Sequence, residues 1–420
     1  MESGGVPVSG RRVVALIASF AICLPFVSGV GATPAFADEV RDRQYWLEDY
    51  GIEDAWEVTR GAGVTIAIID TGVDASHEDL QGTVIAGTDV SGLGSPDGQQ
   101  PVGPASEHGT MVASLAVGRG HDEDAGVIGS APEANILSIS MSFQGTSIPA
   151  DQQIANAVTW AVDNGADVIS LSLTRNTREW PVSWDEAFGY AERNDVVVVA
   201  AAGNRSSGTE IVGAPATMPG VLTVGGVDRS GTASATASSQ GITIGVMAPS
   251  EDLVGAYPGG SYAEWAGTSG ATPIVSGIVA LVRSAYPTMD APNVINRILS
   301  TATPVTGSVP HPLYGYGLID AYAAVTAEVP LVRENPLGSL AEWVVVYRRG
   351  DSDQVVYPLG PRQLPPTPSA PRIGEVPETV SRGVTDDIPL YMVGGLSAVL
   401  VIILTGAGIT VFRASRKPLS

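Results

Sequence analysis

Three side chains of the kinds that nucleophilic hydrolysis needs lie far apart in this sequence. Ser269 stands among small residues just ahead of Pro273, near the expected start of a helix, where free N–H groups and the helix dipole favour a negative charge. His108 precedes a Gly-Thr pair that can open another helix, and Asp70 ends an apolar run. A hydroxyl nucleophile requires a base for its proton and an acidic group that orients the base. The three residues are therefore a candidate nucleophile, base and orienting carboxylate.

A fourth polar side chain, Asn204, ends a second apolar run, and its amide can donate a hydrogen bond to an oxyanion. Each of these residues also has an ordinary structural role, because an Asp at a strand end or a Ser at a helix start is often a cap, and Gly-Asn is a common turn. Two of the four histidines are poorly placed for proton transfer, since His121 lies in a charged loop and His311 between two prolines. His108 is the better candidate for a base.

The elements expected to position these side chains alternate between strand and helix. The apolar runs 64–69 and 195–200 are too continuous for a strand with one wet face and suit the centre of a parallel sheet. Helical patterns cover residues 109–117, 152–164, 184–193 and 273–285. The alternation predicts an α/β domain with a doubly wound, mainly parallel sheet and helices on both faces. Pro273 is expected in the first turn of its helix, where its missing N–H has no cost.

The joint pattern of motifs resembles that of the subtilases. The chain order Asp, His, Asn, Ser is the order of that family, and the resemblance covers residues 44–327. The matching motifs are Asp-Thr-Gly-Val at 70–73, His-Glu-Asp-Leu at 77–80, His-Gly-Thr at 108–110, Ala-Gly-Asn at 202–204, Pro-Ala at 215–216, Met-Ala-Pro at 247–249 and Gly-Thr-Ser at 267–269. The resemblance implies a subtilisin-like fold and a serine endopeptidase that acts through an acyl-enzyme.

This resemblance implies a role for each candidate residue. Ser269 would be the nucleophile and His108 the general base and then acid, while Asp70 would orient His108. Asn204 and the backbone N–H of Ser269 would form the oxyanion hole. A protein or peptide substrate would pair, as an added strand, with one segment of the chain. The residues of that substrate-binding segment are Leu171, Ser172, Leu173 and Thr174.

The sequence departs from the family at several points. Thr174 stands where the family usually has Gly, which alters the primary specificity pocket, and Gly270 replaces the usual bulky residue after the nucleophile. Only 26 residues, 38–63, separate the expected cleavage site from the first core strand, too few for the long propeptide of many secreted subtilases. Asp79 matches a position that binds calcium in some relatives, but no clear metal site accompanies it. We therefore expect catalysis to require no cofactor, with a structural calcium ion as the open alternative.

Both ends of the chain carry hydrophobic segments that predict export and membrane attachment. Arg11 and Arg12 precede an uncharged run that ends in Ala-Phe-Ala at 35–37, which predicts a signal peptide cleaved after Ala37 rather than an uncleaved anchor. Residues 390–412 form an uncharged run of 23 residues followed by basic ones, which predicts a transmembrane helix and a cytoplasmic tail. We expect a single-pass protein of the cell membrane with its catalytic domain outside.

The expected organisation has six segments. They are a signal peptide at 1–37, a peptidase domain at 38–328, a C-terminal extension at 329–360, a Pro-rich stalk at 361–388, a transmembrane helix at 389–412 and a tail at 413–420. In the extension, 343–347 and 354–357 are expected to pair as a hairpin. This layout resembles the mycosins, membrane-anchored proteases associated with type VII secretion, and implies secretion components as partners. Loss of Cys23 with the signal peptide counts against close membership, since mycosins commonly carry disulfides.

Charge and residue content also bear on the classes of function. The formal net charge of −22 repels phosphate backbones, so we expect no nucleic-acid partner. The alternative to an enzyme is a catalytically silent scaffold of a membrane secretion complex that keeps the subtilase fold. The presence of all four catalytic-type residues argues against that alternative.

Overall fold

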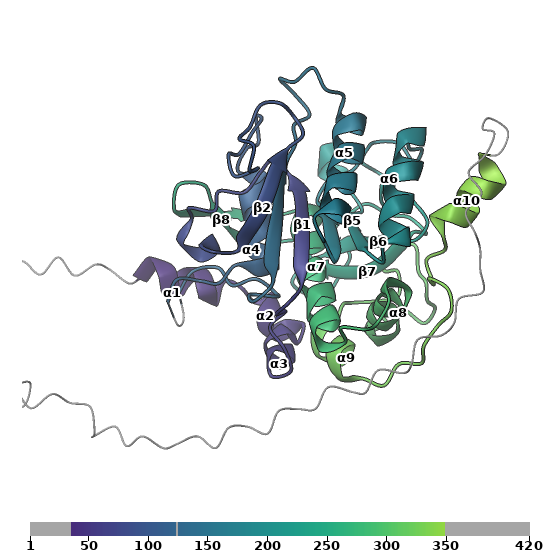
Figure 1. The fold of residues 1–420 in the computed structure, drawn as a ribbon. Helices are drawn as coiled ribbons and strands as arrows, with labels where there is room; N and C mark the ends of the chain where they lie inside the picture. Colours follow the sequence, from purple (N-terminus) through teal and green to yellow (C-terminus); the bar gives the residue numbers. More distant parts are fainter. Residues whose placement is uncertain (1–34, 123–124, 349–420) are drawn as a thin grey trace, which may run out of the picture.

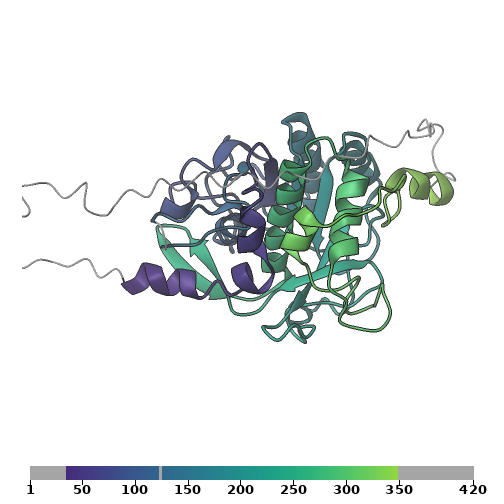
Figure 2. The same cartoon turned by 90° about the horizontal axis from the view of Figure 1, so that it is seen from below.

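The computed structural model of the chain describes residues 35–122 and 125–348, which form a sheet between layers of helices (Figures 1 and 2). Within these residues, a seven-stranded parallel sheet has the order β2-β3-β1-β4-β5-β6-β7, and β8 and β9 form a separate antiparallel hairpin. The strands are β1 (Thr65–Asp70), β2 (Val84–Asp89), β3 (Asn135–Ser140), β4 (Val168–Leu171), β5 (Val197–Ala201), β6 (Leu222–Val227), β7 (Ile244–Pro249), β8 (Leu253–Tyr257) and β9 (Ser261–Trp265).

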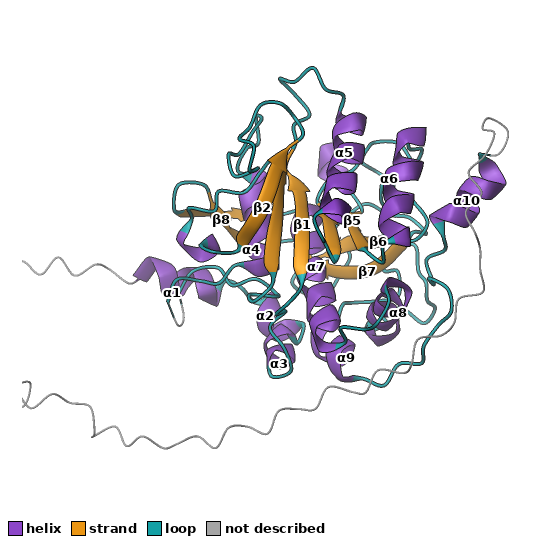
Figure 3. Ribbon diagram, in the orientation of Figure 1, coloured by secondary structure: helices purple, strands orange, loops and turns teal. Residues whose placement is uncertain are grey.

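Helices cover both faces of the sheet, as Figure 3 shows by colour. Helix α5 packs against α6 in one layer, and α4 packs against α7 in the other. The helices are α1 (Ala35–Asp42), α2 (Trp46–Asp49), α3 (Ile52–Trp56), α4 (His108–Val117), α5 (Ala150–Asp163), α6 (Val182–Arg193), α7 (Thr268–Ala285), α8 (Ala291–Thr301), α9 (Ala321–Thr326) and α10 (Leu340–Tyr347). The predicted α/β architecture is confirmed.

The strands at the centre of the sheet are apolar because both of their faces are covered. Strand β1 lies between β3 and β4, and every residue of it after Thr65 is buried; all of β5 is buried as well. Continuous burial removes the alternation of polar and apolar residues that a strand with one wet face would show. The predicted runs 64–69 and 195–200 therefore match β1 and β5 to within two residues.

Helix α7 begins five residues earlier than predicted, which changes the meaning of Pro273. The helix starts at Thr268, so Pro273 is its sixth residue and lies beyond the first turn. A proline there has no N–H to donate to the carbonyl four residues back, which is that of Ser269. The hydroxyl of Ser172 donates to this carbonyl at 2.9 Å instead. Almost all of α7 is buried, which suits a helix that is apolar on every side.

The predicted hairpin in the C-terminal extension is wrong. Residues 343–347 lie in helix α10, and 354–357 lie outside the described residues. Ser339 caps the helix, and Trp343 packs on Trp180 with ring centroids 4.6 Å apart. Arg348, just after the helix, pairs with Asp185 of α6 at 2.6 Å. The β-branched residues suggested strand, but contacts with a distant helix decide the conformation.

Most of the predicted terminal segments lie outside the described residues. These are the signal peptide up to residue 34, the stalk at 361–388, the transmembrane helix at 389–412 and the tail at 413–420. Helix α1 spans the expected cleavage point after Ala37. Among the described residues, no helix has both the length and the apolar character needed to cross a membrane.

A close backbone contact fixes where α4 begins relative to β1. The turn after Asp70 passes so near the start of α4 that a Cβ on Gly109 would lie 2.3 Å from the carbonyl oxygen of Gly72. Thr71 reinforces this contact, because its hydroxyl accepts a hydrogen bond from the N–H of Gly109 at 2.9 Å and donates to the carbonyl of Ser106 at 3.0 Å. Glycine at 109 thus allows the strand end and the helix start to touch.

We predict that Gly109→Ala lowers the free energy of unfolding by about 1–3 kcal/mol, because the added methyl group must push α4 away from the turn. Gly307→Ala is the matched control, since a Cβ there would meet nothing within 4 Å. Denaturant unfolding of both variants measures the difference. Equal stability of the two variants would show that the contact at Gly109 relaxes without cost.

Candidate active site

Asp70 and His108 form a hydrogen-bonded pair at the carboxyl end of β1. The carboxylate of Asp70 is 5% exposed, and Nδ1 of His108 lies 2.8 and 2.9 Å from its two oxygens. The N–H of Thr71 also donates to Oδ1, at 2.7 Å. Because an ionised carboxylate only accepts hydrogen bonds, Nδ1 of His108 carries a proton, and Nε2 is left as the basic atom. His108 is the first residue of α4, which turns its ring toward Asp70.

The environment of His108 favours its protonated form. Burial lowers the pKa of His108, but the charge of Asp70, the hydrogen bond to Asp70 and the charge of Glu107 all raise it. The net result is a pKa above the ordinary value for histidine. A base with a raised pKa has a stronger driving force to accept a proton, and the nearby carboxylate stabilises the imidazolium that forms.

Ser269 is the second residue of α7 and is partly exposed. Its hydroxyl donates to the carbonyl of Ser172 at 3.1 Å, and the hydroxyl of Ser172 donates back to the carbonyl of Ser269 at 2.9 Å. This reciprocal pair joins the start of α7 to the residue that follows β4. The N–H of Ser269 belongs to the first turn of the helix, where backbone donors have no intrahelical acceptor. A hydroxyl and a free N–H therefore occur on one residue.

The amide of Asn204 is oriented by Thr268. Oδ1 of Asn204 accepts hydrogen bonds from the N–H of Thr268 at 2.8 Å and from its hydroxyl at 3.0 Å. The Nδ2 atom is consequently turned toward Gly267, where a Cβ would lie 3.0 Å from it. Gly267 has a φ of 149°, a conformation that other residues rarely adopt. The arrangement presents an amide donor beside the start of α7, as an oxyanion hole requires.

The predicted substrate-binding segment lies beside Ser269 and beside Gly203, the residue before Asn204. Leu171, Ser172 and Leu173 are buried at and just after the end of β4, and Thr174 is half-buried. The methyl group of Thr174 lies 3.1 Å from where a Cβ on Gly203 would stand, and its hydroxyl 2.8 Å from a Cβ on Gly213. Thr174 thus fills space between two glycines that a glycine at 174 would leave open.

Two further histidines take part in a buried network at Asp79. The carboxylate of Asp79 is fully buried and accepts hydrogen bonds from His121 at 2.7 Å and from the N–H of Val127 at 2.8 Å. His77 is also buried, and its Nδ1 accepts from the N–H of Asp79. The described residues contain no group of three or more His, Cys, Asp or Glu side chains placed to hold a metal ion.

Sequence reasoning missed the residues that orient the four candidates. Thr71 and Thr268 hold the starts of α4 and α7, and both lie inside motifs used to identify the site. Their positions in Asp-Thr-Gly and Gly-Thr-Ser were the available signal. Trp265 packs edge-on against His108, with ring centroids 5.7 Å apart. Nothing in the local sequence indicated this contact.

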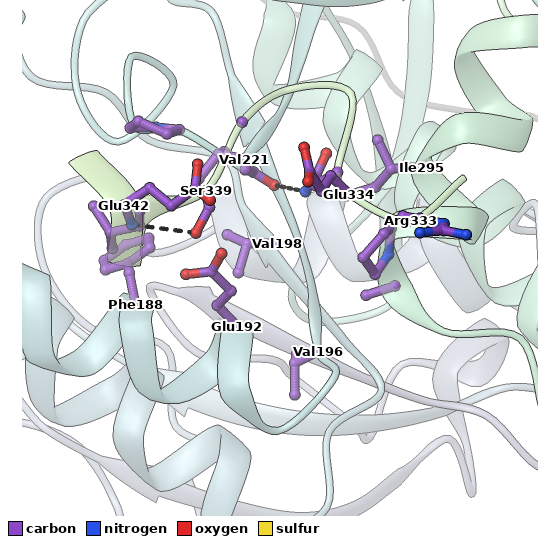
Figure 4. A pocket seen from close by; sticks show the side chains of 17 residues that line it. Phe188, Glu192, Val196, Val198, Val221, Ile295, Arg333, Glu334, Ser339 and Glu342 are labelled. Carbon is purple, nitrogen blue, oxygen red and sulfur yellow. Dashed lines mark hydrogen bonds between the residues drawn. The ribbon is translucent and has the colours of Figure 1, made fainter. Parts of the chain in front are cut away.

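The structure also contains a cavity that the candidate catalytic residues do not line. It has a volume of about 500 Å³ and lies between α6, α8 and the segment that leads to α10 (Figure 4). Phe188, Val198 and Leu340 are among its apolar lining, and Glu192 and Glu342 are among its charged residues. None of the candidate catalytic residues lines it, so the groups for peptide hydrolysis lie elsewhere.

Comparison with known proteins identifies the family of the chain. The sequence pattern of the Subtilase family matches residues 61–317. Subtilisin DY from Bacillus licheniformis is 38% identical over 270 residues, which make up 63% of this chain and 92% of that protein. Thermitase from Thermoactinomyces vulgaris is 34% identical over 286 residues, which make up 67% of this chain and 96% of that protein.

Solved structures show the same relationship. The MycP3 protease from the type VII (ESX-3) secretion system is 30% identical with a TM-score of 0.57, over 71% of this chain and 90% of that one. Fervidolysin from Fervidobacterium pennivorans, a keratinolytic enzyme related to subtilisin, is 29% identical with a TM-score of 0.61, over 70% of this chain and 48% of that one. The resemblance to mycosins is thereby confirmed. The chain belongs to the Subtilase family and is a subtilisin-like serine endopeptidase.

Proposed function

We propose that Ser269, His108 and Asp70 are the catalytic triad and that Asn204 and the N–H of Ser269 form the oxyanion hole. The observation that carries this assignment is the pairing of both Asp70 oxygens with Nδ1 of His108, which leaves Nε2 free to act as a base. The start of α7 supplies the hydroxyl and the N–H, and Thr268 presents the Asn204 amide beside them.

In the proposed reaction, Oγ of Ser269 attacks the carbonyl carbon of the substrate and its proton passes to Nε2 of His108. The negative charge that develops on the carbonyl oxygen is met by Nδ2 of Asn204 and the N–H of Ser269. His108 then gives the proton to the leaving amine as the C–N bond breaks, which leaves an acyl-enzyme. Water, deprotonated by His108, hydrolyses the ester and restores the Ser269 hydroxyl.

We further propose that substrate pairs as a strand with Leu171–Leu173, with Thr174 limiting the adjoining pocket. The hydroxyl of Ser269 donates to the carbonyl of Ser172, so this segment lies directly beside the proposed nucleophile, which supports the position. A strand that pairs there would bring its carbonyl groups to the nucleophile.

The proposed cellular setting is the outer side of the cell membrane, with the chain single-pass and its tail in the cytoplasm. The supports are the signal-like run at 1–37, the uncharged run within 389–412 and the basic residues after it. The proposed partners are type VII secretion components, supported by the similarity to the MycP3 protease and by the Pro-rich segment 361–388. In this setting the peptidase domain acts on exported protein.

The function is tested by Ser269→Ala, which we predict to abolish turnover of a peptide substrate and labelling by a fluorophosphonate probe. Asn204→Ala should still fold and lose about 10²–10³ in kcat, because one oxyanion donor is removed. Ser206→Ala, at an exposed serine after Asn204, is the matched control and should behave as wild type. Cleavage by Ser269→Ala at the wild-type rate would contradict the assignment.

The raised pKa of His108 predicts how activity depends on pH. His108 must be neutral to accept a proton, so kcat/KM should rise with pH through a midpoint above the ordinary histidine value. Asp70→Asn removes the charge that raises the pKa, so the midpoint should move to lower pH while activity falls by about 10⁴-fold. A pH–rate profile of both proteins measures this. An unchanged midpoint in Asp70→Asn would mean that Asp70 does not set the pKa of His108.

The proposed topology predicts that deletion of residues 361–420 releases an active enzyme into the medium. The deleted segment contains none of the proposed catalytic residues. Fractionation should find the full-length protein in the membrane pellet and the truncated protein in the supernatant, with the same kcat/KM. A released, folded but inactive protein would place a necessary residue in the deleted segment.

A further inference from the structure

The β8–β9 hairpin connects the two halves of the active site. In the hairpin, Leu253 pairs with Trp265, and only two residues separate Trp265 from the start of α7. The other strand is fastened to the helix that begins with His108, because the N–H of Ala256 donates to the hydroxyl of Ser114 on α4 at 3.0 Å. One small element therefore contacts α4 and leads directly into α7.

Trp265 makes the contact with the base. Its indole meets the imidazole of His108 edge to face, with an interplanar angle of 81°. The indole Nε1 is buried and has no hydrogen-bond partner among the described residues. Buried indole N–H groups usually find an acceptor, and leaving one unpaired costs free energy.

Two glycines make room for the indole. A Cβ on Gly255 would lie 3.2 Å from Nε1 of Trp265, and a Cβ on Gly270 would lie 3.3 Å from Cζ2. At Gly270 the same Cβ would also lie 2.2 Å from Cδ1 of Leu253, the pairing partner of Trp265. Gly270 stands where the family usually has a bulky residue. Because glycine has no side chain, Leu253 and Trp265 occupy the space beside it.

The link that the hairpin makes between α4 and α7 matters because Ser269 and His108 are held by different partners. Asp70 holds Nδ1 of His108, while the hydroxyl of Ser269 donates to the carbonyl of Ser172. The alignment of base and nucleophile then depends on how α4 and α7 are placed relative to each other. A misplacement of about 1 Å can cost about 100-fold in rate.

We propose that Trp265 is a positioning residue that holds the imidazole of His108 in line with Ser269. In this proposal, Gly255 and Gly270 leave room for the indole of Trp265. The proposal rests on the roles proposed above for His108 and Ser269. It assigns no contact with substrate to Trp265. The residue acts through His108, so its loss should change the chemical step more than substrate binding.

The test compares Trp265→Leu and Trp265→Phe with Tyr257→Leu, which changes an aromatic residue on the same hairpin that is 38% exposed. For each variant, kcat and KM on a peptide substrate are measured as a function of pH, together with the rate of fluorophosphonate labelling. We expect Trp265→Leu to lose about 10- to 100-fold in kcat and in labelling rate, with KM nearly unchanged. The midpoint of its pH profile should rise as water reaches His108. Trp265→Phe should recover much of the loss, and Tyr257→Leu should match wild type.

Wild-type kcat and pH midpoint in Trp265→Leu would overturn the proposal, and so would a rise in KM alone, which would make Trp265 a substrate contact. If Trp265→Leu does not fold, Trp265→Met decides the question, since methionine has no ring for the edge-to-face contact and a folded methionine variant with wild-type kcat and midpoint also overturns the proposal. A wrong catalytic assignment can be told apart from a wrong role for Trp265. If the proposed function is wrong, His108→Ala retains activity, and this result does not depend on the Trp265 variants.

Discussion

The burial of the Asp70 carboxylate is the constraint on which the rest of the candidate active site depends. A carboxylate that is 5% exposed is costly unless hydrogen-bond donors replace water. Nδ1 of His108 and the N–H of Thr71 are those donors, and the first of them requires α4 to begin against the end of β1. Glycine at 109 allows this approach without a clash, since a Cβ there would lie 2.3 Å from the carbonyl oxygen of Gly72. The turn after β1 and the start of α4 are placed so that Asp70 can pair with His108.

The second half of the site depends on backbone groups rather than on charge. Pro273 removes one helical hydrogen bond, and the carbonyl that it frees, on Ser269, accepts the hydroxyl of Ser172. Thr268 in turn fixes the amide of Asn204 through its N–H and its hydroxyl. Small residues dominate here because only they let strand ends and a helix start come within hydrogen-bond distance. The proposed nucleophile is thus held to the sheet by the residue that follows β4 and by the loop after β5.

Sequence reasoning predicted the features that are encoded locally or by a joint motif. The buried strands, the main helices and the four candidate residues follow from continuous apolar runs and from the order of Asp70, His108, Asn204 and Ser269. The features it missed depend on contacts between distant segments. Residues 343–347 have strand propensity, yet Ser339 and the packing of Trp343 on Trp180 make them a helix. The start of α7 was misplaced for a similar reason, because the hydroxyl of Ser172, which is distant in sequence, donates to the carbonyl that Pro273 leaves without its helical donor.

The proposed catalytic residues and the proposed point of attachment lie on different elements. The described chain ends at Arg348, which pairs with Asp185 at 2.6 Å and donates to the carbonyl of Trp180 at 3.0 Å. Both partners lie in or next to α6, which carries none of the proposed catalytic residues. The proposed catalytic residues lie on β1, α4, α7 and the loop after β5. The proposed tether would therefore continue from a segment that is bound to α6 and not to the elements that carry the proposed catalytic residues.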